Sequence, residues 1–171
     1  MNKRKKRYIL SYVLLFVALI LQTTLIGELT IFGIAPSLIL VLVVCFSLMN
    51  DCIPSAVFAV TAGLLLDISG GRIIGFNALL MMYLSIGVVF AGQEFFRETP
   101  RAAAMLVAIS TFVYELIYFI FSFAIFGGGH FFYMIARIIL IECVYNAIVA
   151  IPVYFFVNKF LRIRSTHSLL D

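Results

Sequence analysis

Long uninterrupted runs of apolar side chains dominate this sequence and restrict the environment in which it can fold. A helix needs about 20 apolar residues to cross the hydrocarbon core of a bilayer. The 171 residues hold six apolar runs of 15 to 30 residues, which we expect to be membrane spans at about residues 8–26, 34–49, 53–67, 76–91, 102–126 and 131–160. Charged residues make up only 12% of the chain, whereas soluble domains contain about 25%. We therefore expect a single all-α integral membrane domain.

The same runs exclude several classes of protein. They are continuous and do not alternate with period two, which excludes an outer-membrane β-barrel. Cys45, Cys52 and Cys143 show no CxxC spacing and the two histidines lie far apart, so we expect neither a metal site nor a disulfide framework. The sequence has no Gly-x-Ser-x-Gly elbow, HExxH motif or Walker loop. We expect no enzymatic activity and no cofactor.

The basic residues predict the orientation of the spans. Five of the twelve form a cluster at residues 3–7, where they orient the first helix and contact anionic lipid rather than nucleic acid. With the N-terminus inside, ten lie in cytoplasmic segments, Arg72 lies outside and Arg137 lies within a span. We therefore expect both termini in the cytoplasm. A cleaved signal peptide is the competing interpretation, disfavoured by the length of the first run and the lack of a small-x-small site.

Two features concern how the spans pack. The third run has only about 14 apolar residues, so we expect it to be the weakest span, either buried among other helices or tilted and extended by its flanks. Gly63, Gly75 and Gly87 are expected to allow close approach between helices.

Ionisable side chains within spans cost about 2.5–3.5 kcal/mol on insertion scales, so each needs a partner. Glu115 and Arg137 fall at similar depths in neighbouring runs, which predicts an ion pair that either fixes helix register or belongs to a ligand pocket or partner interface. Glu142 lies about 140° round the helix from Arg137 and is expected to face elsewhere, as a neutral acid within the bundle or as a partner contact. The other polar side chains of the spans are expected to bridge helices: Gln22, Asn77, Ser85, Thr111 and Asn146.

A polar loop after the third run contains the least generic residues of the chain. Asp67 is expected at the C-terminal end of a helix, which is unfavourable for an anion, and needs Arg72 or the N–H groups of the following turn to compensate. Gly70 and Gly71 permit a positive φ in that turn. Asn77 begins the fourth run and either caps it or holds the loop closed. The loop either only reverses the chain or presents a fixed outer surface.

This region resembles the signature of the MreD rod shape-determining family. In that signature a helix ending in Gly-Leu-Leu-x-Asp is followed by a glycine-bearing loop and then by Gly-x-Asn-Ala-Leu. The chain has Gly-Leu-Leu-Leu-Asp at 63–67 and Gly-Phe-Asn-Ala-Leu at 75–79. Pro36-Ser37-Leu38 resembles the family's start of the second span, although Ser37 replaces an acidic or amide residue. The resemblance implies a loop-structuring or partner-contacting role for Asp67, Gly70, Gly71, Arg72, Gly75 and Asn77.

The resemblance also implies a function and a fold. The implied function is a non-enzymatic membrane scaffold of cell elongation in the inner membrane of a bacterium. Its partners are MreC and, through MreC, MreB filaments, a RodA-type glycosyltransferase and a class B penicillin-binding protein. The implied fold is that of the six-helix S-component of energy-coupling-factor vitamin transporters. This supplies an alternative function, a substrate-binding S-component, for which Tyr114, Tyr118, Tyr133 and His130 are candidate pocket side chains.

Overall fold

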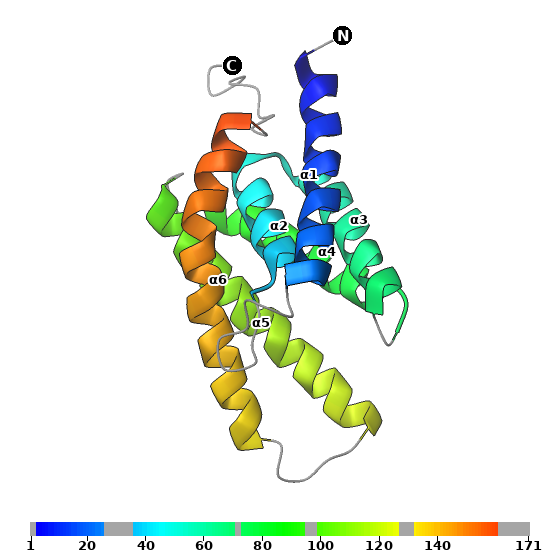
Figure 1. Ribbon diagram of the computed structural model, residues 1–171. Coiled ribbons are helices and arrows are strands. Elements are labelled where there is room, and N and C mark those ends of the chain that lie inside the picture. Colours follow the sequence, from blue (N-terminus) through cyan, green and yellow to red (C-terminus); the bar gives the residue numbers. More distant parts are fainter. Residues whose placement is uncertain (1–2, 26–35, 71–72, 95–98, 127–131, 161–171) are drawn as a thin grey trace.

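The computed structural model describes residues 3–25, 36–70, 73–94, 99–126 and 132–160, with the side chains at 3–5, 25, 93–94, 122–126 and 132–138 outside the description. These residues form six helices and no strand (Figure 1). The helices are α1 (Lys3–Leu25), α2 (Leu38–Met49), α3 (Cys52–Gly70), α4 (Phe76–Glu94), α5 (Pro100–Phe126) and α6 (Phe132–Phe160). The predicted all-α class is confirmed.

Four of the described helices, α1, α3, α5 and α6, are long and apolar enough to cross a membrane. The apolar stretches of α2 and α4 are shorter, Leu38–Met49 and Phe76–Gly92. The chain is a membrane protein. The third run is not the weakest span, because α2 is the shortest described helix. The expected extension of this run by its flanks is confirmed, since α3 begins at Cys52 and continues through Asp67 to Gly70.

The short helix α2 lies at the centre of the bundle. Every residue from Ile39 to Met49 is buried, and α2 packs against each of the other five described helices. Its Phe46 ring stacks on Phe58 of α3 with centroids 4.3 Å apart. A helix that is apolar on all sides is stable either in lipid or in the interior of a protein, and the burial of residues 39–49 places α2 in the core.

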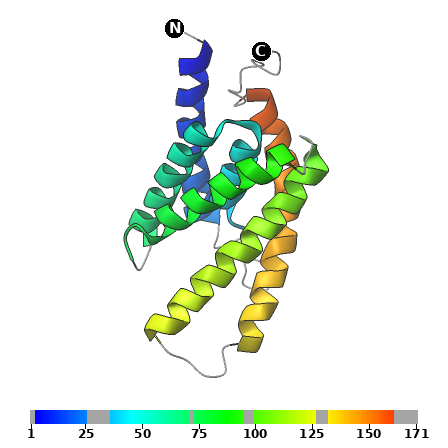
Figure 2. The same ribbon diagram turned by 180° about the vertical axis from the view of Figure 1, so that it is seen from behind.

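The two ends of the bundle differ. The beginning of α1 and the end of α6 lie at one end, whereas the end of α3 and the beginning of α4 lie toward the other (Figure 1). The helices α5 and α6 diverge toward their connection and extend beyond the other helices in both views (Figure 2). Asp67, Gly75 and Asn77 therefore lie away from the basic N-terminal end of α1.

Candidate functional site

The Asp67 carboxylate joins the end of α3 to the beginning of α4. Asp67 is only 3% exposed. Its Oδ2 accepts hydrogen bonds from the backbone N–H groups of Gly75 at 2.8 Å and Ala78 at 3.4 Å, and its Oδ1 accepts from that of Asn77 at 3.3 Å. The first N–H groups of a helix have no partner within the helix and carry partial positive charge. Asp67 is thus an N-terminal cap of α4 supplied by α3.

The groups that stabilise the Asp67 charge differ from those expected from the sequence. Among the described residues, the N–H groups that reach Asp67 come from Gly75 and from the first turn of α4, and none comes from residues 68–70. Gly71 and Arg72 lie outside the described residues, so a contribution from Arg72 stays a prediction. Asp67 is stable near the unfavourable C-terminal end of α3 because the favourable N-terminal end of α4 lies against it.

Two glycines shape this junction in different ways. A Cβ atom on Gly63 would lie 2.4 Å from the Ala78 Cα and 2.6 Å from the Asn77 carbonyl carbon, so α3 and α4 meet there at backbone distance. Gly75 has φ +92°, a conformation that glycine adopts without strain. Gly75 and Gly87 have no atom within 4 Å of an ideal Cβ, so the expectation that these two glycines allow close helix approach is wrong. Gly70 also faces open space and ends α3 without a positive φ, so the positive φ expected there is wrong as well.

Asn77 connects the junction to α5. Its Oδ1 accepts a hydrogen bond of 2.6 Å from the Tyr114 hydroxyl, and both side chains are buried. The Asn77 side chain therefore bridges α4 and α5, whereas Asp67 provides the cap of α4. Phe76 adds a ring contact with Phe121 of α5 at a centroid distance of 4.6 Å. The first turn of α4 is consequently held from both α3 and α5.

The beginning of α2 is held by side chains of two other helices. The Ser37 N–H donates to Asn146 Oδ1 of α6 at 2.9 Å, and the Ile39 N–H donates to Gln22 Oε1 of α1 at 3.1 Å. Asn146 Nδ2 in turn donates to the Thr111 hydroxyl of α5 at 3.1 Å.

The remaining polar bridge is between the Ser47 hydroxyl of α2 and the Ser85 hydroxyl of α4, 2.7 Å apart. Together with the Tyr114 bond to Asn77, these contacts confirm that all five polar residues expected to bridge helices do so.

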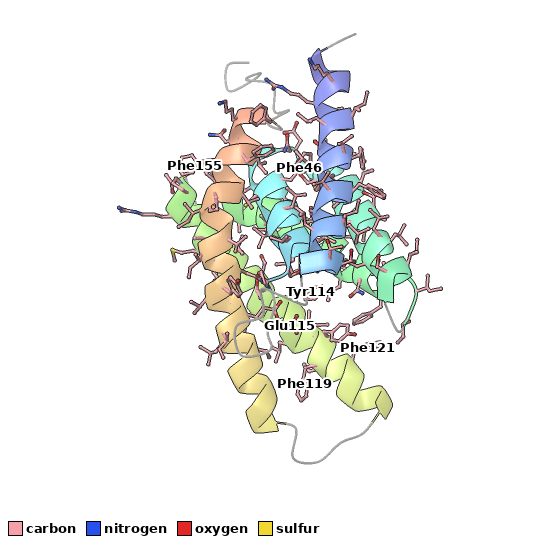
Figure 3. The ribbon with its side chains drawn as sticks, in the orientation of Figure 1. Phe46, Tyr114, Glu115, Phe119, Phe121 and Phe155 are labelled. Carbon is pink, nitrogen blue, oxygen red and sulfur yellow. The ribbon has the colours of Figure 1, made fainter. Side chains whose placement is uncertain are left out.

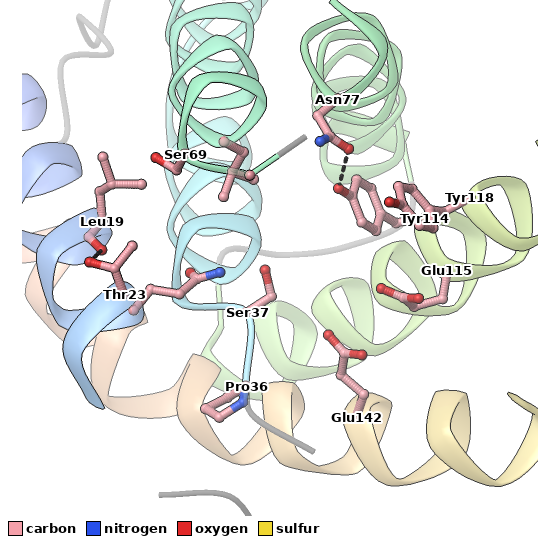
Figure 4. A pocket seen from close by; sticks show the side chains of 13 residues that line it. Leu19, Thr23, Pro36, Ser37, Ser69, Asn77, Tyr114, Glu115, Tyr118 and Glu142 are labelled. Atoms are coloured by element: carbon pink, nitrogen blue, oxygen red, sulfur yellow. Dashed lines mark hydrogen bonds between the residues drawn. The ribbon is translucent and has the colours of Figure 1, made fainter. Parts of the chain in front are cut away.

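A polar cavity lies between the beginning of α2, the end of α3 and the facing sides of α5 and α6. Its volume is about 370 Å³. Tyr114 and Glu115 lie on α5 close to the beginning of α2 (Figure 3). The carboxylates of Glu115 and Glu142 both point into the cavity and toward one another (Figure 4). The sequence reasoning placed Glu142 away from the predicted ion pair and missed this convergence, which depends on how α5 and α6 face each other.

The predicted ion pair between Glu115 and Arg137 stays a prediction, because the Arg137 side chain lies outside the described residues. Among the side chains that the structure describes, those lining the cavity include no lysine or arginine. The described residues also contain no group of three or more His, Cys, Asp or Glu side chains that could hold a metal ion. Tyr114 and Tyr118, two of the candidate pocket side chains, do line this cavity, whereas His130 lies outside the described residues. The Tyr133 side chain lies outside them as well.

Comparisons with known proteins were made for the whole chain. Residues 3–164 match the family model of MreD, described as rod shape-determining protein MreD. Searches of curated proteins and of solved structures returned no match. Because the family match covers nearly the whole sequence and includes both the Asp67 junction and the cavity, the chain belongs to the MreD family of rod shape-determining proteins.

Proposed function

We propose that this protein is a non-catalytic scaffold of lateral cell-wall synthesis in the bacterial inner membrane. Its proposed direct partner is MreC. Through MreC it associates with MreB filaments, a RodA-type glycosyltransferase and a class B penicillin-binding protein. Membership of the MreD family supports a role in rod shape determination. The proposed contact with MreC rests on the junction between α3 and α4, where hydrogen bonds to Asp67 hold the two helices together.

The junction has the properties of a docking surface. Three hydrogen bonds to the buried Asp67 fix the beginning of α4 relative to α3. Beside them Ile68 and Ile74 are 78% and 82% exposed. A surface held rigid before binding loses less conformational entropy when a partner packs on it. We propose that MreC packs on these isoleucines and that Asp67 keeps them in position.

The proposed orientation places this surface outside the cytoplasm. The beginning of α1 carries the basic cluster at residues 3–7, and basic segments are retained on the cytoplasmic side. The end of α6, with Lys159, lies at the same end of the bundle (Figure 1). The junction between α3 and α4 lies toward the other end, so in this orientation it faces the periplasm.

The test compares two acids at opposite ends of α3. Asp67→Asn removes the charge and one of the two acceptor oxygens, whereas Asp51→Asn changes an exposed acid directly before α3. Both proteins should reach the membrane in normal amounts, because neither change adds a charge to an apolar run. Asp67→Asn should reduce the recovery of MreC from membranes in mild detergent and make the cells rounder. Asp51→Asn should do neither.

A surface variant separates docking from folding. Ile74→Ser leaves Asp67 and its acceptor oxygens intact and changes a side chain that is 82% exposed. It should reduce MreC recovery without lowering the thermal stability of the purified protein. Full MreC recovery with both Asp67→Asn and Ile74→Ser would remove this junction from the scaffold mechanism.

One observation favours the alternative function, a substrate-binding S-component. The cavity of about 370 Å³ contains Tyr114 and Tyr118 and has the size of a small-molecule site. Co-purification with an energy-coupling ATPase module and a vitamin, without MreC, would establish that function in place of the scaffold.

A further inference from the structure

The cavity between α2, α5 and α6 has an excess of negative charge among its described lining. Glu142 is only 9% exposed, and its carboxylate points into the cavity opposite Glu115 (Figure 4). The Asn146 amide provides a hydrogen bond to Glu142 but no positive charge. Two carboxylates facing one another at low dielectric repel strongly unless a proton or a cation lies between them. The pair is therefore suited to a positively charged occupant.

Part of the nearby helix end is already occupied by other helices. The beginning of α2 borders the cavity, and helix N-termini often bind anions. Here the N–H groups of Ser37 and Ile39 already donate to Asn146 and Gln22. The two carboxylates would also repel an anion. The lining thus selects for positive charge.

The shape and the other side chains favour an organic cation over a metal ion. Metal ions of the calcium and magnesium type take six or more oxygen ligands, and the described residues offer no group of three acidic or other metal-ligating side chains. Tyr114 and Tyr118 place aromatic rings beside the carboxylates, and aromatic faces attract alkylammonium groups. Leu19 and Leu66 supply apolar wall for the attached methylene groups. A cavity of about 370 Å³ accommodates such a molecule.

We propose that this cavity binds an alkylammonium group, with Glu115 and Glu142 as its counter-charges and the two tyrosines against its carbon atoms. The group is carried either by a free amine or by the headgroup of an aminophospholipid. This site lies beyond the scaffold function and does not depend on it, since the scaffold proposal rests on the junction between α3 and α4.

The first experiment uses the full chain, purified in an uncharged maltoside detergent. Its thermal stability is measured against increasing n-butylammonium, with n-butanol as the neutral control of the same chain length. The melting temperature should rise to a plateau with butylammonium and not with butanol. Glu115→Gln and Glu142→Gln should each weaken the binding by about tenfold or more, because each removes one charged hydrogen-bond acceptor. Asp51→Asn, at an exposed acid outside the cavity, should bind as the wild type does.

The melting temperature measured without butylammonium shows whether each variant is folded. Each Glu→Gln variant should melt at or above the wild-type temperature, because the change relieves repulsion between the carboxylates. Absence of a saturable response in the wild type would overturn the proposal, as would equal responses in the wild type and both Gln variants. A response that appears only after Arg137→Gln would identify Arg137 as the resident counter-charge and would also overturn it.

A second experiment identifies the source of the amine. The chain is placed in nanodiscs of phosphatidylglycerol alone or of phosphatidylglycerol with phosphatidylethanolamine. Loss of butylammonium binding in the nanodiscs that contain phosphatidylethanolamine shows that its headgroup occupies the cavity. Equal binding in both kinds assigns it to a free amine.

Discussion

Replacing Gly63 by alanine tests how α3 and α4 hold the Asp67 cap. Gly63 lies one turn before Asp67 on α3, so both face the first turn of α4. An ideal Cβ on Gly63 would be 2.4 Å from the Ala78 Cα, where ordinary contact begins at 3.4 Å. The contacting atoms are backbone, so the two helices must separate by about 1 Å. The Asp67 bonds to Asn77 and Ala78, at 3.3 and 3.4 Å, would then exceed hydrogen-bond distance.

The expected loss of stability has two parts. Overpacking a closely packed contact costs about 1–3 kcal/mol. Weakening hydrogen bonds to a buried carboxylate adds about 1.5–3 kcal/mol. For a chain of this size each 1 kcal/mol lowers the melting temperature by about 2–4 °C. Gly63→Ala should therefore lower the melting temperature by at least about 5 °C.

Gly87→Ala is the matched control. It makes the same substitution within α4, where no atom lies within 4 Å of the new Cβ. It should leave stability unchanged or raise it by about 0.5–1 kcal/mol, because alanine is the better helix former. The assay is the fraction of monodisperse protein that remains after heating in detergent, followed by size-exclusion chromatography.

A double variant shows whether the Gly63 contact acts through the cap. Gly63→Ala and Asp67→Asn disturb the same contact, so their combined loss should be smaller than the sum of the single losses. Equal melting temperatures for Gly63→Ala and Gly87→Ala would refute the close packing of α3 and α4. Additive losses would refute its connection to the cap.

Three further predictions concern the junction and the topology. Tyr114→Phe should cost about 1–3 kcal/mol in thermal denaturation, because it leaves the buried Asn77 Oδ1 without its donor; an unchanged melting temperature would contradict this role. Gly75→Ala should cost about 1–2 kcal/mol at φ +92°, and a variant as stable as wild type would show that the turn adopts another conformation. A cysteine at position 130, in a variant lacking the three native cysteines, should react with an impermeant thiol reagent from outside; labelling only from the cytoplasm would reverse the orientation.

The sequence predicts the helices well because the length of an apolar run in a membrane protein directly reflects helix length. Two boundaries differ from the apolar runs, because α1 begins at Lys3 within the basic cluster and α3 extends beyond Asp67. The end of α3 has an identifiable cause. The prediction ended the span at Asp67, since a charge in lipid is costly. In the structure the N–H groups of Gly75, Asn77 and Ala78 stabilise that charge, and α3 continues to Gly70. The C-terminal end of α3 depends on N–H groups at the beginning of α4. The length of an apolar run does not reveal such a contact.

The candidate site was predictable only in part for a related reason. A polar side chain inside a membrane bundle needs a partner, so Asn77 and Asn146 were correctly expected to bridge helices. Their particular partners depend on the packing of the helices. Helix packing also separates Gly63 from Gly87. Both are glycines within apolar runs, but only Gly63 meets the backbone of a neighbouring helix. Convergence of Glu115 and Glu142 likewise requires the relative rotation of α5 and α6.

The central position of α2 has a consequence for how the protein is made. The acceptor for the Ser37 N–H at the beginning of α2 is Asn146, which lies 109 residues later in the chain. Since synthesis proceeds from the N-terminus, α2 enters the membrane before α6 exists, and its first turn then lacks one of its two capping side chains. An N–H group without an acceptor is costly in hydrocarbon. A chain that stops before α6 therefore lacks the Asn146 acceptor, so the first turn of α2 is complete only once the last helix has packed against it.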